Sequence, residues 1–103
     1  MPNILSKRYG KALVGMCANA TEKSTVGQEL GRFTEAYENS SELRQVTESP
    51  AFSVEDKKAT VAAVSKALKL SKQVEYCLNF LLERERLGLI GDIHRDFQQR
   101  IDA

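Results

Sequence analysis

Apolar residues recur at intervals of three and four positions along nearly the whole chain, and this spacing predicts helices throughout. Such intervals place side chains on one face of an α-helix, whereas the strict alternation typical of half-buried strands is absent. The only prolines are Pro2 and Pro50, so few positions oppose a helical backbone. We therefore expect an all-α fold, a six-helix bundle that forms one domain over residues 1–103.

The first two predicted helices occupy the N-terminal 39 residues. The first covers about residues 4–19, and the apolar stripe expected to face the core consists of Leu5, Tyr9, Ala12, Leu13, Met16, Cys17 and Ala20. The second begins near residues 21–25, where Thr25 and Gln28 form a capping-box pattern, and its apolar face holds Val26, Leu30, Phe33 and Tyr37. Gly27 and Gly31 each weaken this helix by about 1 kcal/mol relative to alanine, which predicts the close approach of a neighbouring backbone.

Four further helices are predicted after residue 39. A short third helix is capped within the run Asn39 to Glu42 and must end by Ser49, because Pro50 disfavours helix at the residue before it. Ser53 and Asp56 form a second capping box, and the inward residues of that fourth helix are expected to be Val54, Val61, Val64 and Leu68. Ser71 caps the fifth helix, and a sixth covers about residues 89–101 with the apolar face Leu89, Ile90, Ile93, Phe97 and Ile101.

The fifth predicted helix is more apolar than one core-facing side requires. Seven of the nine residues from Val74 to Leu82 are apolar or aromatic, and they cover an arc of about 240°, whereas a surface helix usually has a stripe a little over 100° wide. One edge of the arc, which includes Leu78, can face the core, and Tyr76 and Phe80 are then left in water. Two interpretations remain open: a recognition surface for a partner, or a central helix covered on both sides by its own chain.

Charge and length exclude several function classes. Lys and Arg number 15 against 14 Asp and Glu, so no net field attracts phosphate backbones or anionic lipid. Lys57 and Lys58, the first lysines of the fourth predicted helix, directly follow Glu55 and Asp56 in the sequence. These acidic neighbours argue against a helix-turn-helix protein that binds DNA. No apolar run approaches the ~20 residues that cross a bilayer, and residues 1–5 are too short before the first charges to form a secretion signal.

Few residues suggest catalysis or metal binding. Cys17 and Cys77 are far apart in sequence and lie on apolar stripes, so we expect buried free thiols, although a single disulfide remains open. His94 is the only histidine and lies between Asp92 and Asp96, where we expect it to be solvated. The chain has no nucleophile motif, glycine-rich phosphate loop or paired metal ligands. We predict a protein that is not an enzyme and needs no cofactor or metal.

Three stretches, taken together and in this order, resemble one known family. They are Lys7-Arg8-Tyr9-Gly10-Lys11-Ala12-Leu13, then Glu48-Ser49-Pro50 followed by Lys57 and Lys58, then Leu78-Asn79-Phe80-Leu81-Leu82 leading to Arg86-Leu87. This combination resembles the N-terminal domain of the delta subunit of bacterial F-type ATP synthases, a relative of the mitochondrial oligomycin-sensitivity-conferring protein. The resemblance covers essentially the whole chain and implies a six-helix N-terminal domain. In the family a smaller C-terminal domain follows it, and we expect that second domain to be absent from this chain.

The resemblance also implies a function and a binding surface. In the family, this domain lies on the catalytic head and binds an amphipathic N-terminal helix of an alpha subunit between its first and fifth helices, while the C-terminal domain contacts the stalk b subunit. The implied role is a non-catalytic stator at the cytoplasmic face of the bacterial plasma membrane, in the peripheral stalk of a proton-translocating complex. The corresponding partner-binding residues here are Tyr9, Ala12, Leu13, Met16, Tyr76, Cys77, Phe80 and Leu81.

Two positions depart from the family pattern, and one alternative function remains. The family usually has alanine where Gly10 stands, and it tends to have Asn-Gly where this chain has Arg84-Glu85, which predicts that the fifth helix ends later, at Gly88. The alternative is a helical regulatory domain that associates with itself through the fifth helix. The balanced charge argues against binding to nucleic acid, and the lack of a long apolar run argues against direct insertion into the membrane.

Overall fold

Each of the six stretches with helical apolar spacing forms a helix in the computed structural model, which describes residues 3–103. Residues 1 and 2, the start of the segment considered above as a secretion signal, lie outside the described residues. The helices are α1 (Ile4–Met16), α2 (Ala20–Asn39), α3 (Ser41–Glu48), α4 (Val54–Ala67), α5 (Lys72–Glu83) and α6 (Ile90–Asp102), with a 3-10 turn, η1 (Leu87–Leu89), before α6. No strand occurs within residues 3–103, so the all-α prediction is confirmed.

Side chains cap the N-termini of the first five helices and so determine where each begins. The capping residues are Asn3, Asn19, Ser40, Ser53 and Ser71, and each accepts a hydrogen bond from a backbone N–H in the first turn. The predicted caps Ser53 and Ser71 are confirmed. The cap predicted at Thr25 is wrong, because Asn19 caps the helix six residues earlier and the Thr25 hydroxyl donates to the Thr21 carbonyl inside it.

The fifth helix ends at Glu83, so the prediction that it extends to Gly88 is wrong. Glu85 takes up the left-handed conformation with φ 56°, its N–H donates to the Leu82 carbonyl, and the Arg86 N–H donates to the Leu81 carbonyl. These two bonds form a Schellman motif, which terminates a helix and usually has glycine at the left-handed position. The motif turns the chain so that Leu87, only 3% exposed, is buried at the start of η1.

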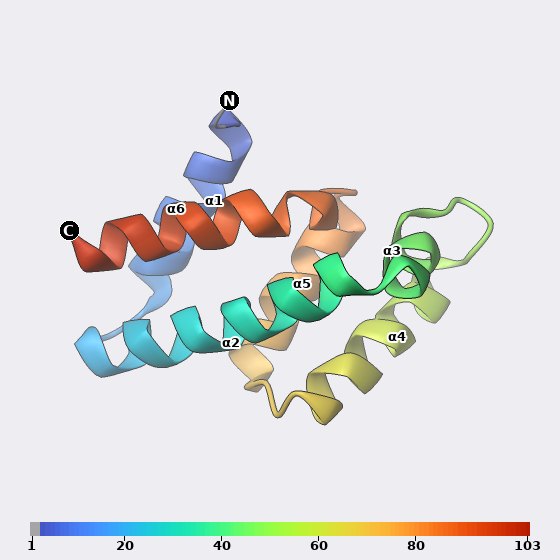
Figure 1. The fold of residues 1–103 in the computed structure, drawn as a ribbon, viewed down its shortest axis with the longest axis horizontal. Coiled ribbons are helices and arrows are strands. Elements are labelled where there is room, and N and C mark those ends of the chain that lie inside the picture. The colour runs from blue at the N-terminus through green and yellow to red at the C-terminus, as the bar shows by residue number, and fades with distance from the viewer. Residues whose placement is uncertain (1–2) are drawn as a thin grey trace.

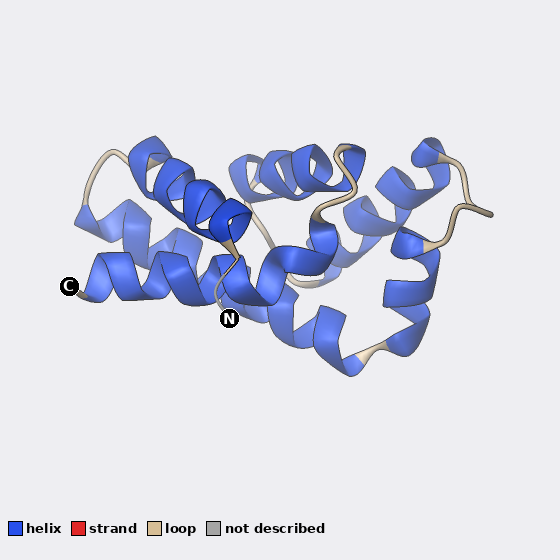
Figure 2. Cartoon of the chain, turned by 90° about the horizontal axis from the view of Figure 1, so that it is seen from above, coloured by secondary structure: helices blue, strands red, loops and turns tan. Residues whose placement is uncertain are grey.

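The helices pack around one hydrophobic core. Figure 1 shows α6 and α2 running lengthwise with α1 crossing α6, while α3 and α4 lie at the far end of the molecule. The view from above in Figure 2 shows the same helices joined by short loops. The most extensive helix contacts join α1 to α6, α2 to α6 and α4 to α5. No helix within residues 3–103 has the length and apolar character needed to cross a membrane.

The core consists mainly of residues that the helical spacing places inside. Those with less than 2% exposure include Leu30, Phe33, Val61, Val74, Leu78, Ile90, Ile93 and Phe97. Val54, predicted to point inward from α4, is 48% exposed. It lies in the first turn of α4, and this turn belongs to an exposed stretch, residues 50–56, that extends beyond the core.

The face of α1 that packs against the rest of the bundle differs from the prediction. Its buried residues are Ser6, Gly10 and Leu13, whereas Ala12 and Met16 of the predicted stripe are exposed. Small side chains at Ser6 and Gly10 suit the close crossing with α6, because a Cβ added at Gly10 would lie only 2.0 Å from Oδ2 of Asp96. The more apolar side of α1, which includes Ala12 and Met16, therefore does not pack against α6 and remains exposed.

Gly27 and Gly31 of α2 allow side chains of α6 to approach closely. The predicted close neighbour was a backbone, and the atoms that lie nearest are side-chain atoms. A Cβ at Gly27 would lie 2.9 Å from Oε1 of Gln98, and one at Gly31 would lie 3.2 Å from Nε2 of His94. His94 is consequently half-buried against α2, and the expectation of a solvated histidine is wrong.

Candidate functional site

An apolar groove lies between α1 and α5, with a volume of about 190 Å³. Four of its lining residues come from each helix, although the helices are about 60 positions apart in sequence. The lining residues are Tyr9, Ala12, Leu13, Met16, Tyr76, Cys77, Phe80 and Leu81. These are the eight residues predicted to bind a partner, and the structure brings all of them together around one hollow.

Burial divides the groove residues between floor and wall. Leu13, Cys77 and Leu81 form the floor, since each is at most 9% exposed and belongs to the core. The walls are formed by Tyr76, which is 69% exposed, and by Met16, which is 44% exposed. The opposite edge of α5 carries Val74, Leu78 and Leu82 into the core, as its arc of apolar residues predicts. The excess apolar surface of α5 is thus the surface that lines this groove.

One end of the groove is aromatic. The rings of Tyr9 and Phe80 meet edge to face, with centroids 6.3 Å apart and an interplanar angle of 77°. The guanidinium carbon of Arg84 lies 3.7 Å from the centroid of the Phe80 ring, a cation–π contact. Phe80 is therefore half-buried, and the prediction that it stands in water beside Tyr76 is wrong for Phe80 and confirmed for Tyr76.

The other end of the groove contains sulfur. Sγ of Cys77 lies 3.9 Å from Sδ of Met16, and both Cys17 and Cys77 are free thiols, with Cys77 buried and Cys17 half-buried. Burial, and to a smaller extent the nearby Cys17 thiol, raises the pKa of Cys77 to about 11. Burial is also the main cause that raises the pKa of Cys17. Both thiols therefore stay protonated at neutral pH and behave as apolar groups, not as nucleophiles.

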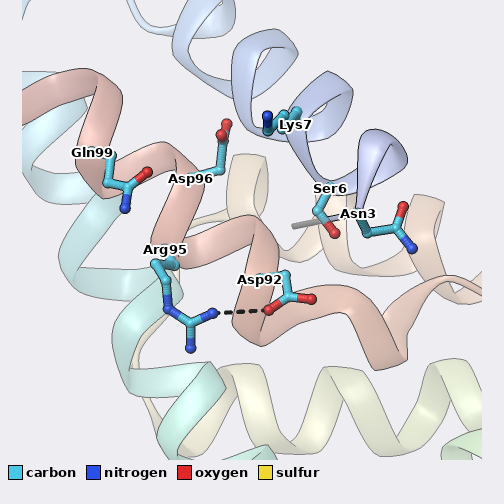
Figure 3. Close-up of a pocket in the computed structure, with 7 residues that line it drawn as sticks. All are labelled: Asn3, Ser6, Lys7, Asp92, Arg95, Asp96 and Gln99. Atoms are coloured by element: carbon cyan, nitrogen blue, oxygen red, sulfur yellow. Dashed lines mark hydrogen bonds and ion pairs between the residues drawn. The ribbon is translucent and has the colours of Figure 1, made fainter. Parts of the chain in front are cut away.

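A second, polar cleft of about 550 Å³ lies between the start of α1 and α6 (Figure 3). It is lined by Asn3, Ser6, Lys7, Asp92, Arg95, Asp96 and Gln99. Arg95 donates to Asp92 at 3.0 Å, and Arg100 donates to Asp96 at 2.6 Å, so both carboxylates are engaged in ion pairs. The buried Ser6 hydroxyl has no hydrogen-bond partner. The sequence did not indicate this cleft, because its two sides are polar helix faces that only the tertiary contact of α1 with α6 joins.

Neither hollow contains a cluster of metal ligands or a histidine among its described lining residues. Within residues 3–103 no group of three or more His, Cys, Asp or Glu side chains lies close enough to hold a metal ion. The only histidine, His94, is packed against Gly31 and lines neither hollow. The chemistry available in the groove is burial of apolar surface, which favours a binding function.

Comparison with known proteins identifies the family. The profile of the ATP synthase delta (OSCP) subunit family matches residues 5–103. ATP synthase subunit delta of Geobacter sp. (strain M21) is 32% identical over 95 residues, which are 92% of this chain and 53% of that protein. ATP synthase subunit delta of Oleidesulfovibrio alaskensis is 31% identical over 103 residues, which are 98% of this chain and 56% of that protein.

These relatives are about twice as long as the matched region, so the chain spans about half the length of the curated relatives it matches. The match nevertheless covers α1 to α6 almost completely, including both walls of the groove. The resemblance noted from the three sequence stretches is confirmed. The chain belongs to the ATP synthase delta (OSCP) subunit family.

Proposed function

We propose that this chain is a non-catalytic domain of the peripheral stalk of an F-type ATP synthase, corresponding to the N-terminal part of the delta subunit. In this role it captures the N-terminal helix of an alpha subunit in the groove between α1 and α5. The alpha subunit belongs to the catalytic head, and the remaining part of the delta subunit contacts the stalk b subunit. The domain thus works in a membrane-associated complex, on its cytoplasmic side, and helps to hold the head stationary.

The observation that carries this proposal is the apolar groove itself. An amphipathic helix binds in a groove through apolar residues spaced three and four positions apart. The long sides of this groove are two helices, and its exposed apolar residues Met16 and Tyr76 would be covered by an incoming helix. Burial of apolar surface is non-directional, so such a contact tolerates small displacements of the two bodies, as a mechanical tether requires.

Titration with a synthetic peptide of the alpha subunit N-terminus tests this proposal. We expect NMR shifts at α1 and α5 in the wild-type chain and loss of binding in the Tyr76→Asp and Phe80→Asp variants, because each places a charge in the apolar groove. Tyr76 is 69% exposed, so its substitution should leave the fold intact even where Phe80→Asp weakens it.

Phe52→Asp is the matched control, since Phe52 is 43% exposed and lies in the loop before α4, apart from the groove. We expect this variant to bind the peptide as the wild type does. Wild-type affinity in Tyr76→Asp, or shifts confined to helices other than α1 and α5, would refute the proposed binding site. Circular dichroism of each variant confirms that it remains helical.

A further inference from the structure

Positive charges surround the apolar groove. Arg8, Lys72 and Arg84 are not among its lining residues, but each is one helical turn from a residue that is. Residues four positions apart on a helix are surface neighbours, which places Arg8 beside Ala12, Lys72 beside Tyr76 and Arg84 beside Phe80. For Arg84 this proximity is direct, since its guanidinium lies over the Phe80 ring. We call these three residues the cationic rim.

Acidic side chains on the two groove helices offset the cationic rim only in part. α1 contains no Asp or Glu, and α5 contains only Glu75 and Glu83. Glu83 forms an ion pair with Lys58 of α4, whose ammonium is the main cause that lowers the pKa of the Glu83 carboxyl, while Arg84 adds a smaller effect. Glu75 is three positions from Lys72 and so lies beside one rim residue, but no residue one turn from Glu75 lines the groove. The rim residues make no ion pair with any other residue of the described range 3–103.

This excess of positive charge around the groove is a local feature and does not follow from the overall charge. The chain has a formal net charge of only +1, and the ion pairs seen elsewhere, such as Arg95 with Asp92 and Arg100 with Asp96, join opposite charges. Complementary charges around an apolar contact select partners, and like charges placed opposite one another exclude them.

We propose that the groove selects an acidic amphipathic helix, one whose apolar stripe is flanked by Asp or Glu residues that meet Arg8, Lys72 and Arg84. This inference rests on the proposed function, because it assumes that the groove binds a helix. It excludes two other occupants. A helix with basic flanks is repelled by the rim, and a second copy of this chain docking through the same groove would place one cationic rim against another.

Two synthetic helical peptides with the same stripe of leucines test the selection, one with glutamates and one with lysines at the flanking positions. We expect the full chain to bind the acidic peptide about tenfold more tightly than the basic one at low salt, as the sum of three surface ion pairs. This difference should shrink at high salt, because exposed charges are screened. Fluorescence anisotropy of labelled peptides measures both affinities.

Charge reversal at Arg8, Lys72 and Arg84 to glutamate should invert the preference. Lys11→Glu is the matched control, because it makes the same change on an exposed position of α1 that lies away from the groove, and it should leave the preference unchanged. If the triple variant unfolds, the neutral variant Arg84→Gln provides the test in its place. We expect it to reduce the preference for the acidic peptide without inverting it.

The outcomes separate this inference from the proposal on which it rests. Equal affinity for both peptides would overturn the selection of acidic helices and leave helix capture standing. Failure of both peptides and of the alpha subunit peptide to bind would overturn both. A mass that rises with concentration in sedimentation of the wild-type chain, and that falls in Tyr76→Asp, would also overturn the selection, since the groove would then accept a second copy.

Discussion

The substitution Gly10→Ala should destabilise the protein, although alanine is the better helix former. In an unobstructed helix the change would stabilise by about 1 kcal/mol. Here the added Cβ would lie 2.0 Å from Oδ2, 2.9 Å from Cγ and 3.0 Å from Cβ of Asp96. A change of the Asp96 χ1 rotamer relieves the first two contacts, but the third requires α1 and α6 to move apart by a few tenths of an ångström.

The size of the effect follows from what Asp96 loses. Its carboxylate is 15% exposed and accepts a bond of 2.6 Å from Arg100, which also donates to the Lys7 carbonyl of α1. Overpacking typically costs about 1–3 kcal/mol, and a partly exposed charged hydrogen bond is worth about 1 kcal/mol. After subtraction of the propensity gain, we expect a net loss of about 1–3 kcal/mol, or about 4–24 °C in Tm for a domain of this size.

A double-mutant cycle with Asp96→Ala isolates the cause. Thermal and urea unfolding of the four proteins should show that Gly10→Ala destabilises the wild type by more than it destabilises the Asp96→Ala background, because that background lacks Oδ2 and Cγ and keeps only the contact with Cβ at 3.0 Å. A Gly10→Ala variant that is more stable than the wild type, or that changes stability equally in both backgrounds, would refute this account of the α1–α6 crossing.

Three other predictions concern stability. Glu85→Gly should stabilise by about 0.5–1 kcal/mol in urea unfolding, since Glu85 has φ 56° in the Schellman motif that ends α5; destabilisation would contradict this. Glu29 is buried and its carboxylate accepts a hydrogen bond from the Ser71 N–H, so Glu29→Ala should cost about 1–3 kcal/mol and Glu29→Gln, which keeps the acceptor, less. Burial raises the pKa of Cys77 from 9.0 to about 11 and that of Tyr37 from 10.0 to about 12. Their contribution to stability is therefore complete below about pH 9 and is lost as pH rises through these values, because the unfolded chain ionises first; Tm should fall between pH 9 and 12, and less steeply in Cys77→Ala.

Helix positions and most core residues could be predicted from local patterns. Apolar spacing and capping residues are properties of short segments, so Val74, Leu78 and Ile93 were assigned to the core without knowledge of the fold. The errors occurred where another helix or a turn motif determined the outcome. Thr25 has the pattern of a cap but lies inside α2, and the left-handed conformation of Glu85 ends α5 without a glycine.

The groove illustrates the same division. Its eight residues were named from a family resemblance and from the excess of apolar residues on α5, and the structure gathers all eight around one hollow. Local pattern could not divide Leu13, which is in the floor, from Met16, which is in the wall, since both lie on the same stripe of α1. It also assigned Phe80 to water, whereas Tyr9 and Arg84 cover its ring.

The all-α class, the six helices and the wide apolar arc of α5 follow from local pattern, because periodicity and capping act over one or two helical turns. Which side of α1 faces inward depends instead on how the helices pack. The close crossing with α6 selects the face with Ser6 and Gly10, whose small side chains permit it, over the face with Tyr9 and Met16. That choice leaves the larger apolar side chains of α1 beside those of α5, and this is the physical reason that the groove exists.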